Sequence, residues 1–230
     1  MPFDRIELGE YFEYMNNKSN STIPEVTFNN GVTMPMFGLG TYQTPPGDTT
    51  ENSVRWALEA GYRKIDTASF YENEEGVGKG LKASGVPREE IFVTTKVWNS
   101  EMGYDGTLEA FDRSRNKLGI DVLDLYLVHW PIKEKFVDTW KALEKLYGDG
   151  KIRAIGVSNF EPEQIDALLE ETQIKPVSNQ VELHPYLNQS HIRQYCKKND
   201  IVAEAWSPIA KGKVLHDETI SRIAESHGTN

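Results

Sequence analysis

Short runs of β-branched and apolar residues alternate along the chain with longer amphipathic segments. The apolar runs predict buried strands, and the segments with a helical period predict helices that cover a sheet. We expect strands at 63–67, 91–97, 123–129, 153–157, 177–181 and 202–205, and helices at 49–60, 73–83, 105–118, 135–147, 162–170, 189–198 and 219–226. Strands that alternate with helices of this length predict a parallel sheet in an α/β domain.

The N-terminal part of the chain departs from this alternation. Residues 1–23 are polar and lack a sustained period, so we expect a flexible tail before a single barrel domain at 24–230. Two short apolar runs then flank Asn29, Asn30 and Gly31, which tolerate the positive φ of a tight turn. We expect a β-hairpin here that plugs one end of the fold, followed by a first barrel strand.

That first strand lies within residues 38–41 and brings the number of predicted strands to seven. Repeating βα units of this size predict a (β/α)8 TIM barrel, which closes with eight strands. An unclosed barrel would leave two hydrogen-bonding edges beside its mouth, which folded proteins normally avoid. We therefore expect an eighth βα unit that the sequence given does not contain.

Polar residues occur where five of the predicted strands end. These residues are Asp66, Lys96, His129, Asn159 and Gln180. In a parallel barrel the C-terminal ends of the strands meet at one face, and this face carries the active site. The sequence therefore predicts that the five side chains gather at one mouth of the barrel.

Four side chains near three successive strands have the chemistry that carbonyl reduction by hydride transfer requires. The carbonyl oxygen gains negative charge as the carbon accepts hydride, so a proton donor has to lie beside it, and Tyr71 can be this donor. A neighbouring Lys96 ammonium would lower the pKa of the phenol, with Asp66 as its counter-ion. His129 would hydrogen-bond the carbonyl oxygen and set its angle.

The segments around these residues resemble the catalytic region of the aldo-keto reductases. The matching segments are D-T-A-S-F-Y-E-N-E at 66–74, T-T-K-V-W at 94–98, D-L-Y-L-V-H-W-P at 124–131, G-L-G-T at 38–41, G-V-S-N-F at 156–160, N-Q-V-E-L-H-P at 179–185 and E-A-W-S-P at 204–208. The resemblance implies a (β/α)8 barrel, NADPH as hydride source, and aldehydes or ketones as substrates. The short link after Pro131 is similar to that of a bacterial and protozoan branch, which includes glyoxal, methylglyoxal and diketogluconate reductases and prostaglandin F synthases.

Position by position, the resemblance implies roles for the matching residues. The catalytic residues would be Asp66, Tyr71, Lys96 and His129, with Tyr71 as the acid. The cofactor-binding residues would be Thr41, Asp66, Ser158, Asn159, Gln180, Trp206, Ser207 and Ile209. The substrate pocket would be walled by Tyr42, Trp98 and Trp130.

The implied cofactor residues would contact the nicotinamide and the pyrophosphate of NADPH. Ser158, Asn159 and Gln180 would hydrogen-bond the nicotinamide carboxamide, Trp206 would stack under the ring, and the loop at 207–213 would follow the pyrophosphate. One departure from the family pattern concerns the adenosine end, because the Lys-Ser/Thr-x-x-x-Arg segment that grips the 2′-phosphate does not occur in this sequence. A 2′-phosphate needs a basic partner, so the sequence given lacks the family's main device for preferring NADPH over NADH.

Composition excludes several other classes of protein. The net charge of −10 argues against a general nucleic-acid surface, and the longest apolar run, at 125–128, is far shorter than the roughly 20 residues of a membrane span. The single cysteine, Cys196, cannot form an internal disulfide, and the N-terminus lacks a signal-peptide pattern. We therefore expect a cytoplasmic protein with no nucleic-acid or membrane partner, and the resemblance implies a monomer that acts on a small carbonyl substrate.

Two motifs invite other interpretations. The glycines at 76, 78 and 80 lack the full G-x-G-x-x-G spacing and do not follow a strand, so they predict tight packing of a helix against the barrel instead of a nucleotide loop. Glu182, His184 and His191 lack any known metal-binding spacing, so we expect no metal site.

Two other functions stay open at this point. One is a barrel that has kept the cofactor pocket but serves as a redox-responsive binding protein, which would bind NADPH tightly without turnover. The other is a metal-dependent barrel hydrolase, which would hold a metal at the ends of the strands.

Overall fold

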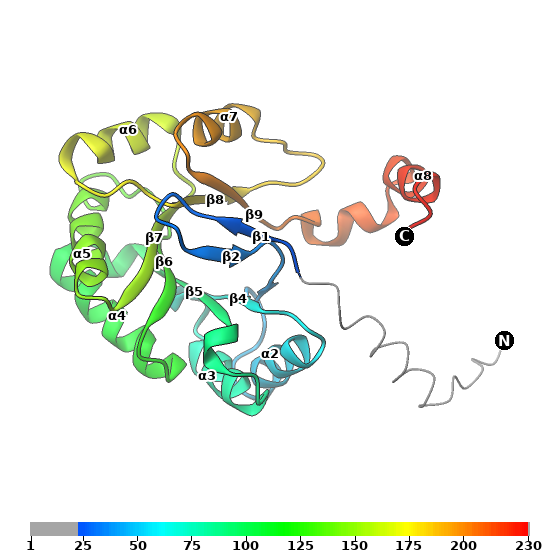
Figure 1. Ribbon diagram of the computed structural model, residues 1–230, viewed down its shortest axis with the longest axis horizontal. Coiled ribbons are helices and arrows are strands. Elements are labelled where there is room, and N and C mark those ends of the chain that lie inside the picture. The colour runs from blue at the N-terminus through cyan, green and yellow to red at the C-terminus, as the bar shows by residue number, and fades with distance from the viewer. Residues whose placement is uncertain (1–22, 230) are drawn as a thin grey trace.

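The computed structural model describes residues 23–229, and seven parallel strands form one curved sheet in it (Figure 1). The strands are β3 (Leu39–Gly40), β4 (Lys64–Asp66), β5 (Phe92–Val97), β6 (Leu123–Val128), β7 (Ile152–Ser158), β8 (Ser178–Glu182) and β9 (Val202–Trp206). Their order in space follows their order in the chain, and each pairs in parallel with the next. The C-terminal ends of all seven strands therefore lie at one mouth of a (β/α)8-type barrel, as the sequence predicts.

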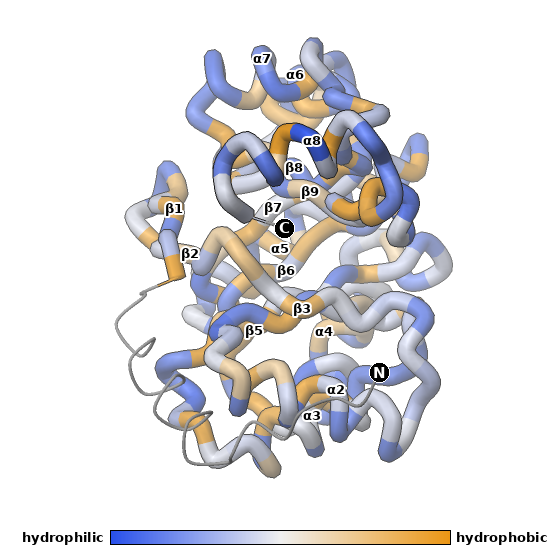
Figure 2. The backbone as a smooth tube through the Cα atoms, turned by 90° about the vertical axis from the view of Figure 1, so that its right-hand side faces the viewer, coloured by the Kyte–Doolittle hydropathy of each residue, from blue (hydrophilic) through white to orange (hydrophobic). Residues whose placement is uncertain are grey.

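Helices alternate with these strands, and all but the last of them cover the outside of the sheet (Figure 1). They are α2 (Asp48–Glu59), α3 (Glu74–Ala83), α4 (Tyr104–Leu118), α5 (Phe136–Gly148), α6 (Pro162–Glu171), α7 (Ser190–Lys198) and α8 (Glu218–Ser226). Four short 3-10 turns are additions to the predicted elements: η1 (Ser69–Tyr71), η2 (Arg88–Glu90), η3 (Asn99–Glu101) and η4 (Ala210–His216). The last helix, α8, projects from the barrel beside η4 (Figures 1 and 2).

An antiparallel hairpin, β1 (Glu25–Thr27) and β2 (Thr33–Pro35), precedes the barrel. Its buried Phe28 packs edge-on against Phe92 at the start of β5, with 6.3 Å between the ring centroids. The turn closes with a hydrogen bond from the Gly31 amide to the Phe28 carbonyl, and the φ of Gly31 is 85°. These contacts confirm the predicted hairpin plug. The predicted tail at 1–23 lies outside the described residues except for Ile23.

The glycines of α3 make a close seam with the neighbouring helices. A Cβ atom on Gly78 would lie 2.5 Å from the carbonyl oxygen of Leu118, which ends α4. A Cβ atom on Gly80 would lie 2.6 Å from the carbonyl oxygen of Glu51 in α2. Any larger side chain would force the helices apart. The predicted tight packing is therefore present, but its partners at Gly78 and Gly80 are the neighbouring helices instead of the barrel strands.

Buried apolar residues fill the space between the sheet and its helices, and a smaller cluster fills the hairpin end of the barrel. Figure 2 shows β6 as largely hydrophobic and the outer helix α7 as largely hydrophilic. Inside the barrel, Lys64 of β4 forms an ion pair with Glu204 of β9, although these two strands are not paired in the sheet. No helix within residues 23–229 combines the length and the apolar character that a bilayer span requires.

Candidate active site

Three polar side chains predicted to be catalytic meet at the mouth of the barrel because their strands are parallel neighbours. Asp66 is the last residue of β4, Lys96 is the penultimate residue of β5, and His129 directly follows β6. Tyr71 joins them from η1, the 3-10 turn that follows β4. The structure therefore brings together the four residues that the sequence selected.

Lys96 is the centre of this group, with a side chain that is almost completely buried. Its Nζ lies 2.5 Å from Asp66 Oδ1, 2.9 Å from the Thr67 carbonyl oxygen and 3.4 Å from the Tyr71 hydroxyl. Burial by itself lowers the pKa of a lysine, but the Asp66 carboxylate and the Tyr71 oxygen outweigh burial and raise the pKa of Lys96. Lys96 is therefore an ammonium that points at the phenol oxygen.

The pKa of the Tyr71 phenol differs from the value expected from the sequence. Burial raises its pKa, and this effect exceeds the opposing effect of the Lys96 ammonium, so that the pKa of Tyr71 lies above its ordinary value. The sequence predicted a lowered pKa because the depth of burial cannot be read from a strand end. A raised pKa keeps Tyr71 protonated at neutral pH, so the phenol is a proton donor held beside a cation.

The His129 ring lies edge-on to Tyr71, with 5.8 Å between the ring centroids, and edge-on to Trp98 at 5.0 Å. Burial, with the nearby Lys96 ammonium as a further cause, lowers the pKa of His129 to about 3. The imidazole is therefore neutral across the physiological range and has one N–H to donate. Its buried Nδ1 has no hydrogen-bond partner within residues 23–229.

A row of amide and hydroxyl groups joins this cluster from β7 and β8. Gln180 Nε2 donates a 2.8 Å hydrogen bond to Asp66 Oδ2, and Ser158 Oγ donates one of 2.7 Å to the Gln180 carbonyl. Asn159, which has a positive φ of 63°, donates from Nδ2 to the His129 carbonyl at 3.1 Å. Gln180 and Asn159 are therefore bonded directly to catalytic residues, and Ser158 is bonded to Gln180 and Asn159.

Trp206 ends β9 and completes the same row. Its indole N–H donates a 2.8 Å hydrogen bond to Asn159 Oδ1, which fixes the orientation of a half-buried ring. No hydrogen bond from the described residues reaches Gln180 Oε1. A flat aromatic face beside an accepting carbonyl oxygen matches the two demands of a nicotinamide, namely stacking for its ring and an acceptor for its carboxamide N–H.

The first loop of the barrel is tied to the Tyr71 turn by a side chain that the sequence analysis missed. Asn73 Nδ2 donates to the Thr41 carbonyl at 2.8 Å and to the Thr44 carbonyl at 3.1 Å. Thr41 is buried, and its neighbour Tyr42 packs against Tyr71 with ring centroids 5.0 Å apart. The sequence showed only an asparagine at the start of the predicted helix at 73–83, and the burial that demands these bonds is visible only in the structure.

Aromatic side chains stand beside the polar cluster. Trp98 stacks on Phe70, with 3.8 Å between centroids and 20° between planes, and its other contact is the His129 ring. Trp130 is 40% exposed and Phe70 is 45% exposed, so both present apolar surface to solvent at this mouth. Phe70 is a further residue that the sequence analysis missed, because its neighbour Tyr71 carried the motif.

The predicted pyrophosphate loop lies beyond β9, at the edge of the site. A hollow of about 540 Å³ here is lined by Glu182, His184, Tyr186, Ala210, Lys211 and Lys213. Ser207 and Lys211 have positive φ values of 51° and 55°, and Ile209 is 52% exposed. Two lysines in one hollow supply local positive charge on a chain whose net charge is −10.

The metal interpretation finds no support in the described residues. Within residues 23–229 no three potential ligands of the histidine, cysteine, aspartate or glutamate type converge. His184 Nε2 lies 3.4 Å from Glu182, whereas His191 bonds Glu161 at 2.8 Å. The three residues considered from sequence therefore do not form one site.

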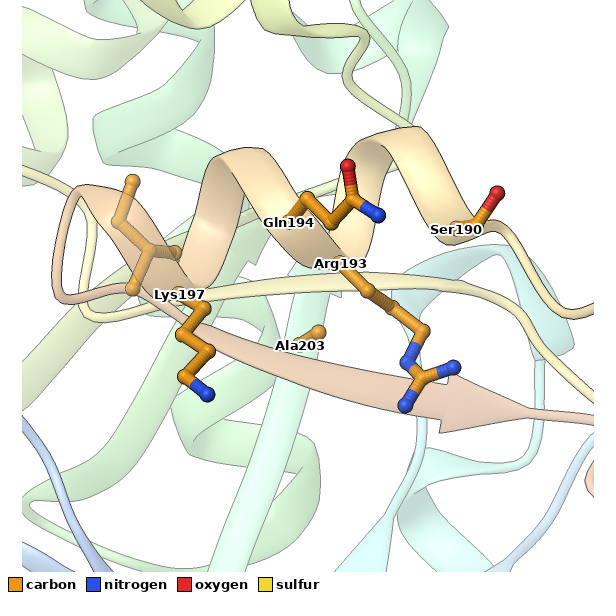
Figure 3. Close-up of a pocket in the computed structure, with 6 residues that line it drawn as sticks. Ser190, Arg193, Gln194, Lys197 and Ala203 are labelled. Carbon is orange, nitrogen blue, oxygen red and sulfur yellow. The ribbon is translucent and has the colours of Figure 1, made fainter.

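A second hollow, of about 430 Å³, lies between α7 and β9 (Figure 3). Its lining residues are Ser190, Arg193, Gln194, Lys197, Ile201 and Ala203. None of the residues predicted for catalysis or cofactor binding lines this hollow, so it is not part of the candidate active site.

Comparison with known sequences agrees with this geometry. The model of the aldo/keto reductase family matches residues 36–229. A 9,11-endoperoxide prostaglandin H2 reductase of Trypanosoma cruzi is 56% identical over 205 residues, which are 88% of this chain and 72% of that protein. A glyoxal reductase of Bacillus subtilis is 55% identical over 202 residues, which are 88% of this chain and 73% of that protein.

Solved structures are similar over the same region. A crystal structure of an aldo/keto reductase from Brucella melitensis has a TM-score of 0.87 and 48% identity, and the match covers 90% of this chain and 79% of that one. A variant of Gox0644 in complex with NADPH has a TM-score of 0.85 and 47% identity, with coverage of 90% and 76%.

Proposed function

Because the chain belongs to the aldo/keto reductase family, an oxidoreductase family, we propose that it reduces small aldehydes, ketones and dicarbonyls to alcohols with NADPH. The observation that carries this proposal is the contact of the Tyr71 hydroxyl with the Lys96 ammonium at 3.4 Å, beside a neutral His129. These groups supply a proton donor, a cation and a hydrogen-bond donor at one point.

The proposed reaction assigns each of these groups a task. NADPH supplies the hydride when it is bound. Tyr71 donates its phenolic proton to the carbonyl oxygen, and the adjacent Lys96 ammonium stabilises the phenolate that forms. The neutral His129 ring donates one hydrogen bond to the same oxygen and orients the carbonyl group. Asp66 keeps Lys96 charged and in place.

The proposed cofactor site uses the row of residues beside this group. Gln180, together with Ser158 and Asn159, would bind the carboxamide, which selects the ring face turned towards Tyr71. Trp206 would stack against the ring. The NADPH complex of the Gox0644 variant supports NADPH, and the lysine-lined hollow beyond β9 offers charge for its phosphates.

The substrate class is inferred from the wall of the site. The aromatic residues Tyr42, Trp98 and Trp130 would hold the carbon side of a small carbonyl compound, and the glyoxal reductase relative supports a dicarbonyl. A single barrel domain at 24–230, the monomeric state and the cytoplasmic location expected from the sequence stay predictions.

Turnover of methylglyoxal with NADPH, measured by the loss of NADPH absorbance, tests the proposal. We expect turnover by the wild-type chain and a loss of about 10² to 10⁴ in kcat for Tyr71→Phe, because general acid catalysis contributes factors of this size. NADPH affinity should be unchanged in the variant. Equal rates would refute the role of Tyr71, and tight NADPH binding without turnover on any carbonyl would favour a redox-responsive binding protein.

A further inference from the structure

A carboxylate outside the barrel interior holds the turn that carries Tyr71. Glu101 ends η3, the 3-10 turn that follows β5. One oxygen of Glu101, Oε2, accepts hydrogen bonds from Ser69 Oγ at 2.6 Å and from the Trp98 backbone amide at 3.2 Å. The other oxygen, Oε1, accepts from Arg113 Nη2 of α4 at 2.9 Å. Glu101 therefore connects three separate segments at the catalytic end of β5.

The bond from Ser69 matters most because Ser69 begins η1 and Tyr71 ends it. The Ser69 hydroxyl has a single hydrogen and two acceptors within reach, Glu101 at 2.6 Å and the Lys96 carbonyl at 3.1 Å. The shorter, charge-assisted bond to the carboxylate receives the hydrogen. The turn is thus fixed to Glu101 at its first residue, two positions before the proton donor.

The other end of the same turn is fixed independently. Asn73 bonds the carbonyls of Thr41 and Thr44, and its side-chain oxygen accepts from Thr67 Oγ1 at 3.2 Å. Tyr71 therefore lies between two anchors, one made by Asn73 and one by Glu101. The Tyr71 hydroxyl makes one 3.4 Å hydrogen bond, to Lys96, and its ring packs against Tyr42 and His129. The two anchors fix the backbone from which this ring extends.

We propose that Glu101 is a positioning residue for the proton donor, acting through the Ser69 hydroxyl on the Tyr71 turn and through the backbone on Trp98. This inference rests on the proposed reduction of carbonyls. Glu101 itself does not touch the catalytic oxygen or nitrogen atoms, so its effect is on the placement of Tyr71 and Trp98.

The charge of Glu101 is suited to this task. Partial burial disfavours its ionised form, but hydrogen bonds from Ser69, Arg113 and the Trp98 amide outweigh burial and lower the pKa of Glu101. The carboxylate is therefore ionised throughout the neutral range and accepts all three bonds. Without it, the Ser69 hydroxyl keeps only the longer bond to the Lys96 carbonyl, and the charge-assisted link between η1 and η3 is lost.

The test compares Glu101→Ala and Ser69→Ala with a matched control, Glu109→Ala. Glu109 lies on α4, is exposed, and pairs with the same Arg113 at 3.6 Å, so its loss removes a charge beside the network without touching Ser69. The assay measures kcat and KM for methylglyoxal, the Kd of NADPH and the thermal unfolding midpoint. We expect kcat to fall about tenfold or more in both test variants, since misplacement of a catalytic group by about 1 Å can cost about a hundredfold. Glu109→Ala should leave kcat unchanged.

A double variant separates positioning from general destabilisation. If Glu101 acts through Ser69, the loss of kcat in the Glu101→Ala/Ser69→Ala double variant is smaller than the product of the two single losses, with the Kd of NADPH unchanged. Glu101→Gln, which keeps an accepting oxygen, should recover part of the lost rate. Additive losses, or a fall in kcat that follows the unfolding midpoint across all variants, would overturn the proposal.

A measurement without turnover distinguishes this inference from the proposed function. The Tyr71 phenol can be followed by ¹³Cζ NMR, with its signal assigned among the ten tyrosines from the Tyr71→Phe variant. Loosening the turn changes both the burial of the phenol and its distance from Lys96, and both set the pKa of Tyr71. Glu101→Ala should therefore shift the pKa of Tyr71 relative to wild type. A wild-type chain without turnover refutes the proposed reduction, whereas an unchanged titration of Tyr71 in Glu101→Ala refutes the positioning role.

Discussion

The two sides of the barrel mouth differ in how far the chain's own contacts fix them. On the β4–β6 side, Lys96 is 1% exposed and bonds Asp66, Thr67 and Tyr71. On the β9–η4 side every residue of β9 is only partly buried, and Leu215 in η4 is 66% exposed. The proton-donating side is therefore fixed by the chain's own contacts, whereas β9 pairs only with β8 among the described residues and its other edge is open.

This difference has a physical reason. A transition state is stabilised by groups that are already oriented when charge develops, so the proton donor and its cation have to be rigid. The β9–η4 side is exposed because β9 is an edge strand of the sheet, and a ligand that binds only the folded state there contributes stability. We expect substitutions on the β4–β6 side to reduce both the stability and the reaction rate. Substitutions on the β9–η4 side should reduce the affinity for NADPH.

The largest effect on stability is expected for Lys96→Met. The substitution leaves the Asp66 carboxylate without its cationic partner in a mostly buried position, which costs about 3–5 kcal/mol of unfolding free energy. Denaturant unfolding measures this loss. The matched control is Lys211→Met on the exposed β9–η4 side, which should change the unfolding free energy by no more than about 0.5 kcal/mol. Equal effects at the two lysines would remove the distinction between the two sides.

The next effect is a dependence of stability on pH that comes from His129. Its pKa is lowered from 6.5 to about 3, so the unfolded chain takes up a proton over a range in which the folded chain does not. The stabilisation is complete above about pH 6.5 and is lost as the pH falls towards 3, at up to about 1.4 kcal/mol per pH unit. The unfolding free energy of His129→Asn, measured at several pH values, should fall less steeply on acidification. Parallel curves for the two proteins would show that His129 is protonated in the native state.

The smallest effect is expected at Trp206, on the opposite side. Trp206→Ala should weaken NADPH binding about tenfold because stacking is lost, and Trp206→Tyr should retain most of the affinity. Fluorescence titration measures both Kd values, and the unfolding free energy without cofactor should change far less than in Lys96→Met. A loss of stability as large as that of the lysine variant would contradict the comparison.

The sequence predicted the residues of the site because they follow from strand order. Parallel strands place Asp66, Lys96 and His129 at one mouth whatever the loops do, and close helix packing explains the glycines of α3. The direction of the Tyr71 pKa shift was wrong because burial depends on groups from many segments. The bond between Ser69 and Glu101 was missed because the two residues are 32 positions apart and belong to no shared pattern.

A crystal structure of the NADPH complex tests the central claim most directly. We predict that the Tyr71 hydroxyl stays in contact with the Lys96 amine beside the His129 ring, that Trp206 lies against the nicotinamide, and that any rearrangement is confined to the β9–η4 side. A nicotinamide bound away from Tyr71, or a Tyr71 hydroxyl out of contact with Lys96 in the ordered complex, would contradict the account.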